Sequence, residues 1–387
     1  MRIAIVTGHF MPEIGYQEVY LARALAKKGH DVRVFTSTAI SPTGKKIRQT
    51  DYEEGLTRNE TYNYEVLRLK PTMARGAKVY SRKLKKNLDA WKPDMALCVA
   101  VSKYWPYQIF KKPQAYKTVA IFGDADEYIN IKRGVFKLKY VLYKLSFYVL
   151  KAYIYNLAWK NADKVVCNLP ETRGFIQKLI SKSTYEKAAP KVNELYLGFD
   201  ANDFFFDQEG RDRLRNQYDL SDSLALITVT RINPQKRLER IIDLADKVMS
   251  EGVKLKYFII GLQNDEYGEQ FKRYVQSKEN SENFEVLPFM SHSEVRSYLS
   301  MSDYGFWMQA AISIQEAMGT GLKVIIPKTL SLNHLVLEGQ NGYYYGPDSM
   351  IEDLPAILKK AEIGSRDEVA KINEKYAYDN LCELVIA

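Results

Sequence analysis

Cysteines and histidines are few in this chain of 387 residues, and they are scattered. The three cysteines, Cys98, Cys167 and Cys382, lie far apart, and the first two fall in apolar, strand-like runs. This pattern predicts buried thiols in a reducing compartment rather than a disulfide framework. The four histidines are equally dispersed, so no Cys/His cluster has the spacing of metal ligands. We therefore expect no metal centre.

Long apolar runs are also missing. No stretch of about 18 uncharged apolar residues occurs, so we expect no membrane-spanning helix. The chain starts directly on the strand-like run Arg2–Val6 instead of a charged and then apolar leader. A cytoplasmic location follows as the expectation, either free or peripheral at the membrane face.

Acidic residues are fewer than basic residues, 47 against 56, so the net charge is +9. A basic balance is typical of proteins that meet nucleic acids, anionic membranes or phosphorylated ligands. No nucleic-acid-binding motif is present, so we expect no nucleic-acid partner. Membrane and phosphate remain as the explanations of the charge.

The apolar pattern forms two series of short strands separated by helices. The first series has seven strand candidates, at residues 3–7, 32–36, 65–69, 96–101, 118–122, 164–167 and 194–197. The second has six, at residues 224–230, 255–260, 284–287, 304–307, 324–326 and 343–345. Several runs are apolar without alternation, which is typical of parallel strands covered by helices on both faces.

Two such series predict an α/β protein with two Rossmann-like, doubly wound domains that face each other across a cleft. Open parallel sheets bind ligands at the carboxyl ends of their strands, so the cleft is the expected site. Turn-forming residues cluster between 200 and 222. We place the first domain at residues 1–205 and the second at 206–365. Residues 366–387 are expected to form a helix that crosses back to the first domain.

Two segments do not follow this repeat. Residues 41–64 are polar and rich in Gly, Thr and Glu, which predicts a long surface loop. Residues 133–160 have a helical pattern rich in aromatic and aliphatic side chains, with Lys137, Lys144 and Lys151 on one face. Such a helix is either buried or pressed into an anionic membrane surface, where lysine, tyrosine and tryptophan are favoured. Both interpretations stay open.

The turn after the first strand contains Gly8 and Gly15 and leads into a helix through Tyr16. A helix start offers free N–H groups and a positive dipole end, which suit a phosphate. The spacing is not that of a dinucleotide-binding fingerprint, so turn geometry alone is the favoured explanation of the glycines.

The second domain opens on a strand followed by Arg231 and Lys236. Two cations at the carboxyl end of a sheet can neutralise a departing diphosphate, because that chemistry needs fixed positive charge where negative charge grows. The alternative is solvated surface charge. The position at a strand end favours function.

A third stretch begins a short helix ended by glycine. Glu316 lies in this helix, where its carboxylate can accept the two hydroxyl groups of a ribose. The backbone N–H groups of Ile312, Ser313 and Ile314 come just before it and can serve a phosphate. A simple first-turn acid, favoured by the helix dipole, is the other explanation of Glu316.

Together these stretches resemble the retaining glycosyltransferases of family 4, which have the GT-B fold. The resemblance covers nearly the whole chain. It depends on an ordered set of matches: Gly15-Tyr16-Gln17-Glu18, Lys28-Gly29-His30-Asp31-Val32, Leu197-Gly198-Phe199-Asp200 with Phe204, Arg231 and Lys236, Asp303, Glu316-Ala317-Met318, Gly321, and Gly339-Gln340-Asn341-Gly342.

The resemblance implies transfer of a sugar from a nucleotide diphosphate donor, such as a UDP- or GDP-sugar, with retention and without a metal or other cofactor. Arg231 and Lys236 would stabilise the leaving diphosphate, and Glu316 would hold the ribose. The remaining donor contacts would come from Gly15, Tyr16, the N–H groups of residues 312–314 and the backbone near Phe289. The acceptor would be a glycan or lipid-linked glycan.

The chain departs from the family pattern at three places. Tyr16 replaces the second glycine of the phosphate loop, and Met308 stands where the first of two donor-loop glutamates is expected. A histidine common after the fifth strand is absent, and the segment Gly123–Glu127 follows instead. Within it, Asp124 or Asp126 would orient the acceptor hydroxyl.

Three alternatives follow from these departures. The aspartate pair is also a pattern that can hold Mg²⁺ or Mn²⁺ against a diphosphate, although Arg231 and Lys236 already supply cations. The missing glutamate suggests a donor-binding protein with little transferase activity. An epimerase acting on a nucleotide sugar ranks last, because no convincing acid and base pair is present.

Overall fold

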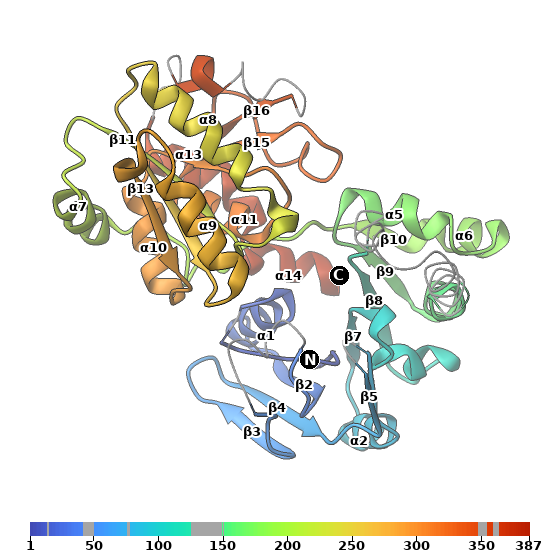
Figure 1. The fold of residues 1–387 in the computed structure, drawn as a ribbon. Coiled ribbons are helices and arrows are strands. Elements are labelled where there is room, and N and C mark those ends of the chain that lie inside the picture. Colours follow the sequence, from blue (N-terminus) through green and yellow to red (C-terminus); the bar gives the residue numbers. More distant parts are fainter. Residues whose placement is uncertain are drawn as a thin grey trace. The chain divides into compact units, whose positions relative to one another are not determined.

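The computed structural model describes residues 1–13, 15–41, 50–75, 78–124, 149, 151–346, 354–358 and 364–387. The chain forms two compact units. Figure 1 shows the fold with colours that follow the sequence. The first unit holds Met1–Leu197 together with Tyr378–Ala387, and the second holds Gly198–Ala377. Each unit contains its own sheet and its own helices, so both are α/β.

The first unit is built on an eight-stranded sheet of order β10-β9-β8-β7-β1-β2-β4-β3. Its strands are β1 (Arg2–Val6), β2 (Asp31–Ser37), β3 (Gly55–Asn59), β4 (Tyr64–Leu69), β7 (Met95–Val99), β8 (Lys117–Phe122), β9 (Lys164–Cys167) and β10 (Val192–Glu194). All neighbours pair in parallel except β3 and β4. A separate antiparallel pair joins β5 (Met73–Arg75) to β6 (Lys78–Tyr80).

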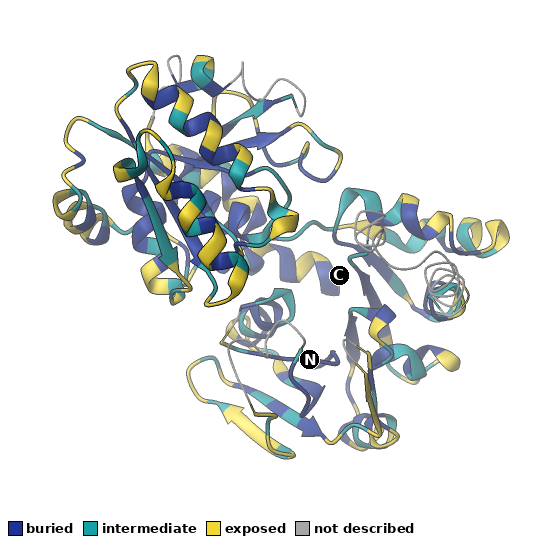
Figure 2. Ribbon diagram, in the orientation of Figure 1, coloured by how far each residue is buried: buried dark blue, intermediate teal, exposed yellow. Residues whose placement is uncertain are grey.

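Helices cover this sheet, and its central strands are apolar. They are α1 (Gln17–Lys27), α2 (Lys83–Trp91), α5 (Pro170–Gln177), α6 (Lys182–Ala188) and α14 (Tyr378–Ile386), with 3-10 turns η2 (Val101–Lys103), η3 (Pro106–Lys111) and η4 (Ala189–Lys191). Residues 151–161 are also helical. Every residue of β7 is buried, and Figure 2 shows the central strands in dark blue. Burial on both faces explains the unbroken apolar runs of the sequence.

The loop expected at residues 41–64 was wrong for its last part, because Gly55–Asn59 forms the edge strand β3. This strand pairs antiparallel with β4, from Gly55 opposite Arg68 to Asn59 opposite Tyr64. Three of its five residues are exposed, so it has no apolar alternation to reveal it in the sequence. Main-chain hydrogen bonds to the neighbouring strand hold such an edge strand in place. Tertiary structure decides which strands pair.

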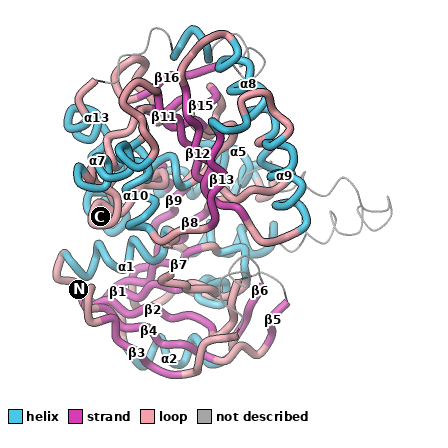
Figure 3. The backbone as a smooth tube through the Cα atoms, turned by 60° about the vertical axis from the view of Figure 1, so that its left-hand side comes forward, coloured by secondary structure: helices cyan, strands magenta, loops and turns pink. Residues whose placement is uncertain are grey.

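The second unit is built on a six-stranded, all-parallel sheet of order β13-β12-β11-β14-β15-β16. Its strands are β11 (Leu224–Val229), β12 (Leu255–Leu262), β13 (Phe284–Pro288), β14 (Tyr304–Phe306), β15 (Lys323–Pro327) and β16 (Gly342–Tyr345). Figure 3 shows β11, β12 and β13 side by side. The helices are α7 (Gln208–Gln217), α8 (Glu239–Ser250), α9 (Glu266–Gln276), α10 (His292–Met301), α11 (Ile312–Gly319) and α13 (Arg366–Asn373), with turns η5 (Pro234–Lys236), η6 (Ser281–Asn283) and η7 (Glu374–Tyr376).

The units divide at positions that differ from those expected at 205/206 and 365/366. Residues 198–205 belong to the second unit because Phe199 and Phe204 are buried in its core. Helix α13 also belongs there, since the Asn373 amide donates to the Met318 carbonyl (3.0 Å) and accepts from Asn341 (2.7 Å). The segment expected to cross back is therefore shorter than predicted, and α14 alone returns to the first unit.

No helix in the described part of the chain is both long enough and apolar enough to span a bilayer.

Candidate functional site

The carboxyl end of β11 is shaped by close contact with β12. Gly261 has a φ of +124°, and a Cβ added to it would lie 2.0 Å from the Thr230 carbonyl oxygen. The Ile232 N–H donates to the Gly261 carbonyl oxygen (3.1 Å), which fixes the chain on both sides of Arg231. Only glycine allows this approach of two backbones, so Gly261 sets where the Arg231 turn begins.

Lys236 and Arg231 lie in the turn that follows. The Asn233 side chain caps η5 by accepting from the Gln235 N–H (3.0 Å), and Lys236 ends this turn. The Lys236 ammonium group donates to the Ala310 carbonyl oxygen (3.3 Å), whereas the Arg231 side chain is exposed. Lys236 therefore links the turn after β11 to the loop after β14.

The loop after β14 leads into α11, and the first N–H groups of a helix have no acceptor within it. Ile312 and Ser313 occupy the first two helical positions. The Ile314 N–H donates to the Ala311 carbonyl oxygen (3.1 Å), so this predicted phosphate contact is engaged in the local turn. The N–H groups of Ile312 and Ser313 remain as donors at this helix start.

Trp307 is a site residue that the sequence did not single out. Its indole N–H lies 3.1 Å from the Val229 carbonyl oxygen and 3.1 Å from the Ser313 hydroxyl oxygen. The side chain is 1% exposed, so these two contacts join the end of β11 to the start of α11 inside the core. A lone tryptophan at the end of an apolar strand is typical of a core residue, so its local pattern carries no functional signal.

Two further residues predicted to bind the donor, Glu316 and Phe289, lie in the second unit. Glu316 lies in α11 and is 7% exposed, so its carboxylate is largely withdrawn from water. Phe289 directly follows β13 and is 52% exposed. Because all strands of this sheet are parallel, Phe289 lies at the same carboxyl edge as Arg231, whereas Glu316 lies beyond the first turn of α11.

In the first unit, Gly15 and Tyr16 form the entry to α1. Gly15 has a φ of +65°, in the left-handed region that glycine adopts at no steric cost. Tyr16 is the N-cap residue, and its carbonyl oxygen accepts from the Val19 N–H (2.8 Å). Burial raises the pKa of Glu18 in the first turn, and this outweighs a backbone hydrogen bond and the charge of Lys103.

Asp124 follows β8 and is held by two residues of the 151–161 helix. Its carboxylate accepts from the Lys151 ammonium group (3.0 Å) and from the Tyr155 hydroxyl. Burial alone would raise the pKa of Asp124, but the charge of Lys151 and the hydrogen bonds from Tyr155, Lys151 and Ser102 hold that pKa below its usual value. The carboxylate is therefore ionised at neutral pH.

This contact changes the interpretation of the lysine face expected at residues 133–160. Lys151 points to Asp124 and its side chain is only 16% exposed, so it is not available to a membrane surface. Trp159 is fully buried in the core of the first unit. The described end of the segment is thus a core helix, with Tyr153 (55% exposed) as its outward aromatic residue. Lys137 and Lys144 lie outside the described residues.

Asp126 also lies outside the described residues, so the structure does not place the second carboxylate of the pair. In the part of the chain that the structure describes, no three His, Cys, Asp or Glu side chains gather as a metal site would require. Asp124 itself is occupied by a cation and a hydroxyl donor.

Comparison with known families gives a match over the second unit. Residues 210–378 match the family model described as Glycosyl transferases group 1. This part of the chain is therefore similar to the group 1 glycosyl transferases, which is consistent with the resemblance of the sequence motifs. Comparison with curated proteins finds no match.

Solved structures resemble the whole chain. Sucrose-phosphate synthase from Thermosynechococcus elongatus has a TM-score of 0.71 at 14% identity, covering 99% of this chain and 96% of that one. Anabaena HepE in complex with UDP has a TM-score of 0.68 at 14% identity, with 100% and 98% covered. WaaG, a glycosyltransferase involved in lipopolysaccharide biosynthesis, has 0.64 at 15% identity, with 99% and 98% covered. These likenesses show the fold and confirm the predicted GT-B class.

Proposed function

We propose that this chain, whose residues 210–378 match the group 1 glycosyl transferases, moves a sugar from a nucleotide diphosphate donor to an acceptor. The acceptor is a saccharide or a lipid-linked saccharide. The transfer retains the anomeric configuration of the sugar, and it does not require a metal ion. The observation that carries this proposal is the gathering of Arg231, Lys236 and the start of α11 at one edge of the second sheet.

The charge at this edge fits the leaving group. As the bond from the anomeric carbon to the diphosphate breaks, negative charge grows on the phosphate oxygens, and preorganised positive groups lower the barrier. Lys236 is held in place by the Ala310 carbonyl oxygen, and the Ile312 and Ser313 N–H groups add the positive end of a helix dipole. The Glu316 carboxylate accepts hydrogen bonds from the ribose hydroxyl groups. The roles of Gly15, Tyr16 and Phe289 stay predictions.

The first unit is proposed to supply the acceptor side. Asp124 is ionised and still has acceptor capacity, because a carboxylate offers about four lone-pair sites. Its role is to accept a hydrogen bond from the acceptor hydroxyl and orient it for attack. A carboxylate with a lowered pKa is a weak base, so we assign Asp124 to orientation rather than to proton abstraction.

One observation favours a second candidate, a donor-binding protein with little transferase activity. Met308 stands where a donor-loop glutamate is expected, and its side chain packs against the apolar cluster of the second unit. A thioether cannot hydrogen-bond the hydroxyls of the transferred sugar as a carboxylate does. Both candidates share the donor site and differ only in turnover.

The test is a thermal-shift screen of nucleotide sugars, beginning with UDP-glucose because HepE was solved with UDP. A ligand at about one hundred times its dissociation constant stabilises a protein by about 2.7 kcal/mol. We expect such a shift for one donor, and its loss in Arg231→Ala. Arg273→Ala removes an exposed arginine of α9 in the same unit and should keep the shift.

The two candidates separate in a turnover assay. Transfer, or slow release of free sugar from the donor that binds, supports the enzyme. Binding with neither reaction supports the donor-binding protein. No binding by any nucleotide sugar, or an equal shift in Arg231→Ala, would refute the proposed site.

A lipid-linked acceptor predicts contact with an anionic membrane through residues 133–160. Val149 and Tyr153 are the exposed large apolar residues at the described end of this segment. Sedimentation with vesicles that contain phosphatidylglycerol tests this part, and a protein that stays in the supernatant would limit the acceptor to soluble saccharides.

A further inference from the structure

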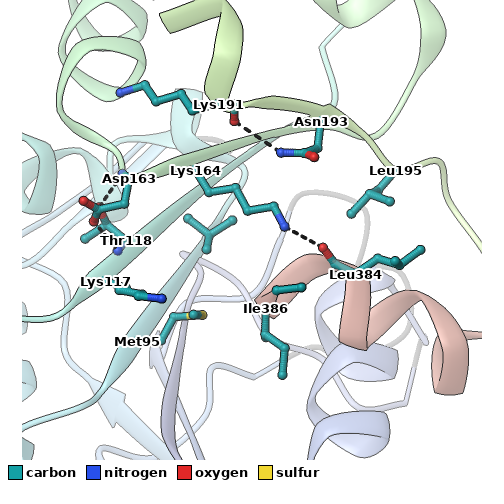
Figure 4. Close-up of a pocket in the computed structure, with 12 residues that line it drawn as sticks. Met95, Lys117, Thr118, Asp163, Lys164, Lys191, Asn193, Leu195, Leu384 and Ile386 are labelled. Atoms are coloured by element: carbon teal, nitrogen blue, oxygen red, sulfur yellow. Dashed lines mark hydrogen bonds between the residues drawn. The ribbon is translucent and has the colours of Figure 1, made fainter.

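A cavity of about 550 Å³ lies in the first unit, away from the residues assigned above. It is lined by the first residues of three parallel strands, Met95 of β7, Lys117 of β8 and Lys164 of β9. The end of α14 closes it with Leu384 and Ile386, as Figure 4 shows. Its size falls within the range of about 300–1,000 Å³ that is usual for small-molecule sites.

The cavity is distinct from the proposed catalytic edge. Gly15 and Asp124 follow the carboxyl ends of β1 and β8, whereas the cavity lies at the amino ends of β7, β8 and β9 and beside β10. Ligands of open parallel sheets normally bind at the carboxyl ends, so the proposed sugar transfer leaves this cavity unexplained.

Positive charge exceeds negative charge in its lining. The charged groups are three lysines, Lys117, Lys164 and Lys191, against two carboxylates, that of Asp163 and the terminal one at Ala387. The Asp163 carboxylate already accepts from the Thr118 N–H (2.7 Å) and hydroxyl (2.8 Å). Among the described residues, no ion pair joins these lysines to a carboxylate, the terminal one at residue 387 included.

Two of the three lysines, Lys164 and Lys191, are held by neutral partners instead. The Lys164 ammonium group donates to the Leu384 carbonyl oxygen (2.6 Å), and Lys191 turns to the carbonyl oxygens of Lys160 (3.1 Å) and Ala162. In Figure 4 the Lys117 and Lys164 side chains extend into the space beside Ile386. Burial lowers the pKa of Lys164 and of Lys191, so each charge is costly and a bound anion would offset that cost.

We propose that this cavity binds a small soluble phosphate monoester, with Lys117 and Lys164 as the residues that contact the phosphate. Lysine binds phosphate as a compact point charge with three donors, and the Lys164 ammonium group keeps donors beyond its contact with the Leu384 carbonyl oxygen. The apolar side chains of Met95, Leu195 and Ile386 offer contact to the carbon part of the ligand. This site is independent of the proposed sugar transfer.

Binding would also act on α14. The cavity is walled by Leu384 of this helix and by Leu195, which lies two residues before the point where the chain leaves the first unit. A ligand between Lys117, Lys164 and the helix would hold α14 against the edge of the sheet.

Calorimetric titration of the full chain with sn-glycerol 3-phosphate and with inorganic phosphate tests the site, with glycerol as the neutral control. We expect the two phosphates to bind and glycerol not to bind. Lys117→Gln should weaken binding about tenfold or more, and Lys117→Gln/Lys164→Gln should abolish it. Lys164→Arg keeps the charge and should retain binding even if Lys164→Gln disturbs α14.

Two controls separate this site from the proposed donor site. Lys182→Gln removes a highly exposed lysine of the same unit and should leave binding unchanged. Arg231→Gln should also leave it unchanged. Binding lost in Arg231→Gln but kept in Lys117→Gln would assign the anion to the second unit and overturn the proposal, as would the absence of any phosphate binding.

Hydrogen exchange gives a second measurement. sn-Glycerol 3-phosphate should slow exchange of the main-chain amides of residues 378–387 in the wild type and not in the double variant. Unchanged exchange in the wild type at saturating ligand would contradict a site closed by α14.

Discussion

Asp124 shows how burial and charge compete at a single residue. Removal from water disfavours an ionised carboxylate, yet Lys151 and Tyr155, one helical turn apart, both approach it. The same contacts raise the pKa of the Tyr155 hydroxyl well above its usual value, chiefly through burial and then through the charge of Asp124. The phenol therefore stays protonated and remains a donor at any physiological pH.

We predict that Lys151→Met shifts the pH dependence of sugar transfer. Without the ammonium charge, the pKa of Asp124 rises, and the carboxylate that orients the acceptor is protonated at a higher pH. The acidic limb of the kcat/KM profile should therefore move to higher pH, while donor binding is unchanged.

Lys160→Met is the matched control, because Lys160 is an exposed lysine of the same helix. Its profile should overlay that of the wild type. If the acidic limb of the Lys151→Met profile stays in place, Asp124 does not orient the acceptor hydroxyl.

At the scale of elements, the end of α10 is held by three arginines. Arg211 and Arg215 of α7 and Arg366 of α13 donate to the last carbonyl groups of α10, at residues 300–302. These carbonyls have no partner within the helix, and cations favour this end of its dipole. Asp303 is 2% exposed and pairs with Arg215 (3.2 Å) and Arg211 (3.3 Å).

The pKa of Arg366 reflects the crowding of positive charge around this helix end. Burial lowers its pKa to about 9, and the charge of Arg211 adds to that effect, while Asp303 opposes it. Asp303 thus balances cations that would otherwise repel one another around one helix end.

We predict that Asp303→Asn destabilises the second unit by about 3–5 kcal/mol, the usual cost of breaking a buried ion pair from one side. Thermal unfolding followed by hydrogen exchange of peptides from α7 and α10 would measure it. Asp212→Asn, an exposed acid of α7, should stay within about 0.5 kcal/mol. Equal effects of the two variants would show that Asp303 contributes nothing beyond surface charge.

At the scale of the whole molecule, the two C-terminal helices belong to different units although they are close in sequence. Helix α13 packs with α11, whereas α14 packs on α1 through the Tyr20 and Tyr378 rings, whose centres are 5.4 Å apart. An ion pair between Lys27 and Asp379 (2.6 Å) borders that contact. The chain therefore crosses between the units at Leu197/Gly198 and again at Ala377/Tyr378.

We predict that substitutions in the two helices weaken different units. Leu381→Ala removes a side chain that is 7% exposed in α14 and should cost the first unit about 2–5 kcal/mol. Val369→Ala, at a position that is 2% exposed in α13, should weaken only the second unit. Hydrogen exchange of β1 and of β15 reports the two units separately, and a loss of protection in both strands for either variant would contradict the division.

The sequence predicted most of the fold because parallel strands buried on both faces leave unbroken apolar runs. Twelve of the thirteen strand candidates overlap a strand over most of their length, whereas the candidate at residues 194–197 shares only Glu194 with β10. It missed β3 because an exposed edge strand has no such pattern. It placed α13 wrongly with α14 because both are amphipathic, and only their packing partners distinguish them.

The amino-acid sequence by itself determined the two α/β series, the match to group 1 glycosyl transferases and the positions of Arg231 and Lys236 after the end of a strand. These follow from local periodicity and from short motifs, which act over a few residues. Tertiary structure decided that Lys151 pairs with Asp124, that Trp307 joins β11 to α11, and that three lysines from separate segments line one cavity. Such contacts join residues far apart in the chain, and no local pattern records which distant side chains will meet when the sheets assemble.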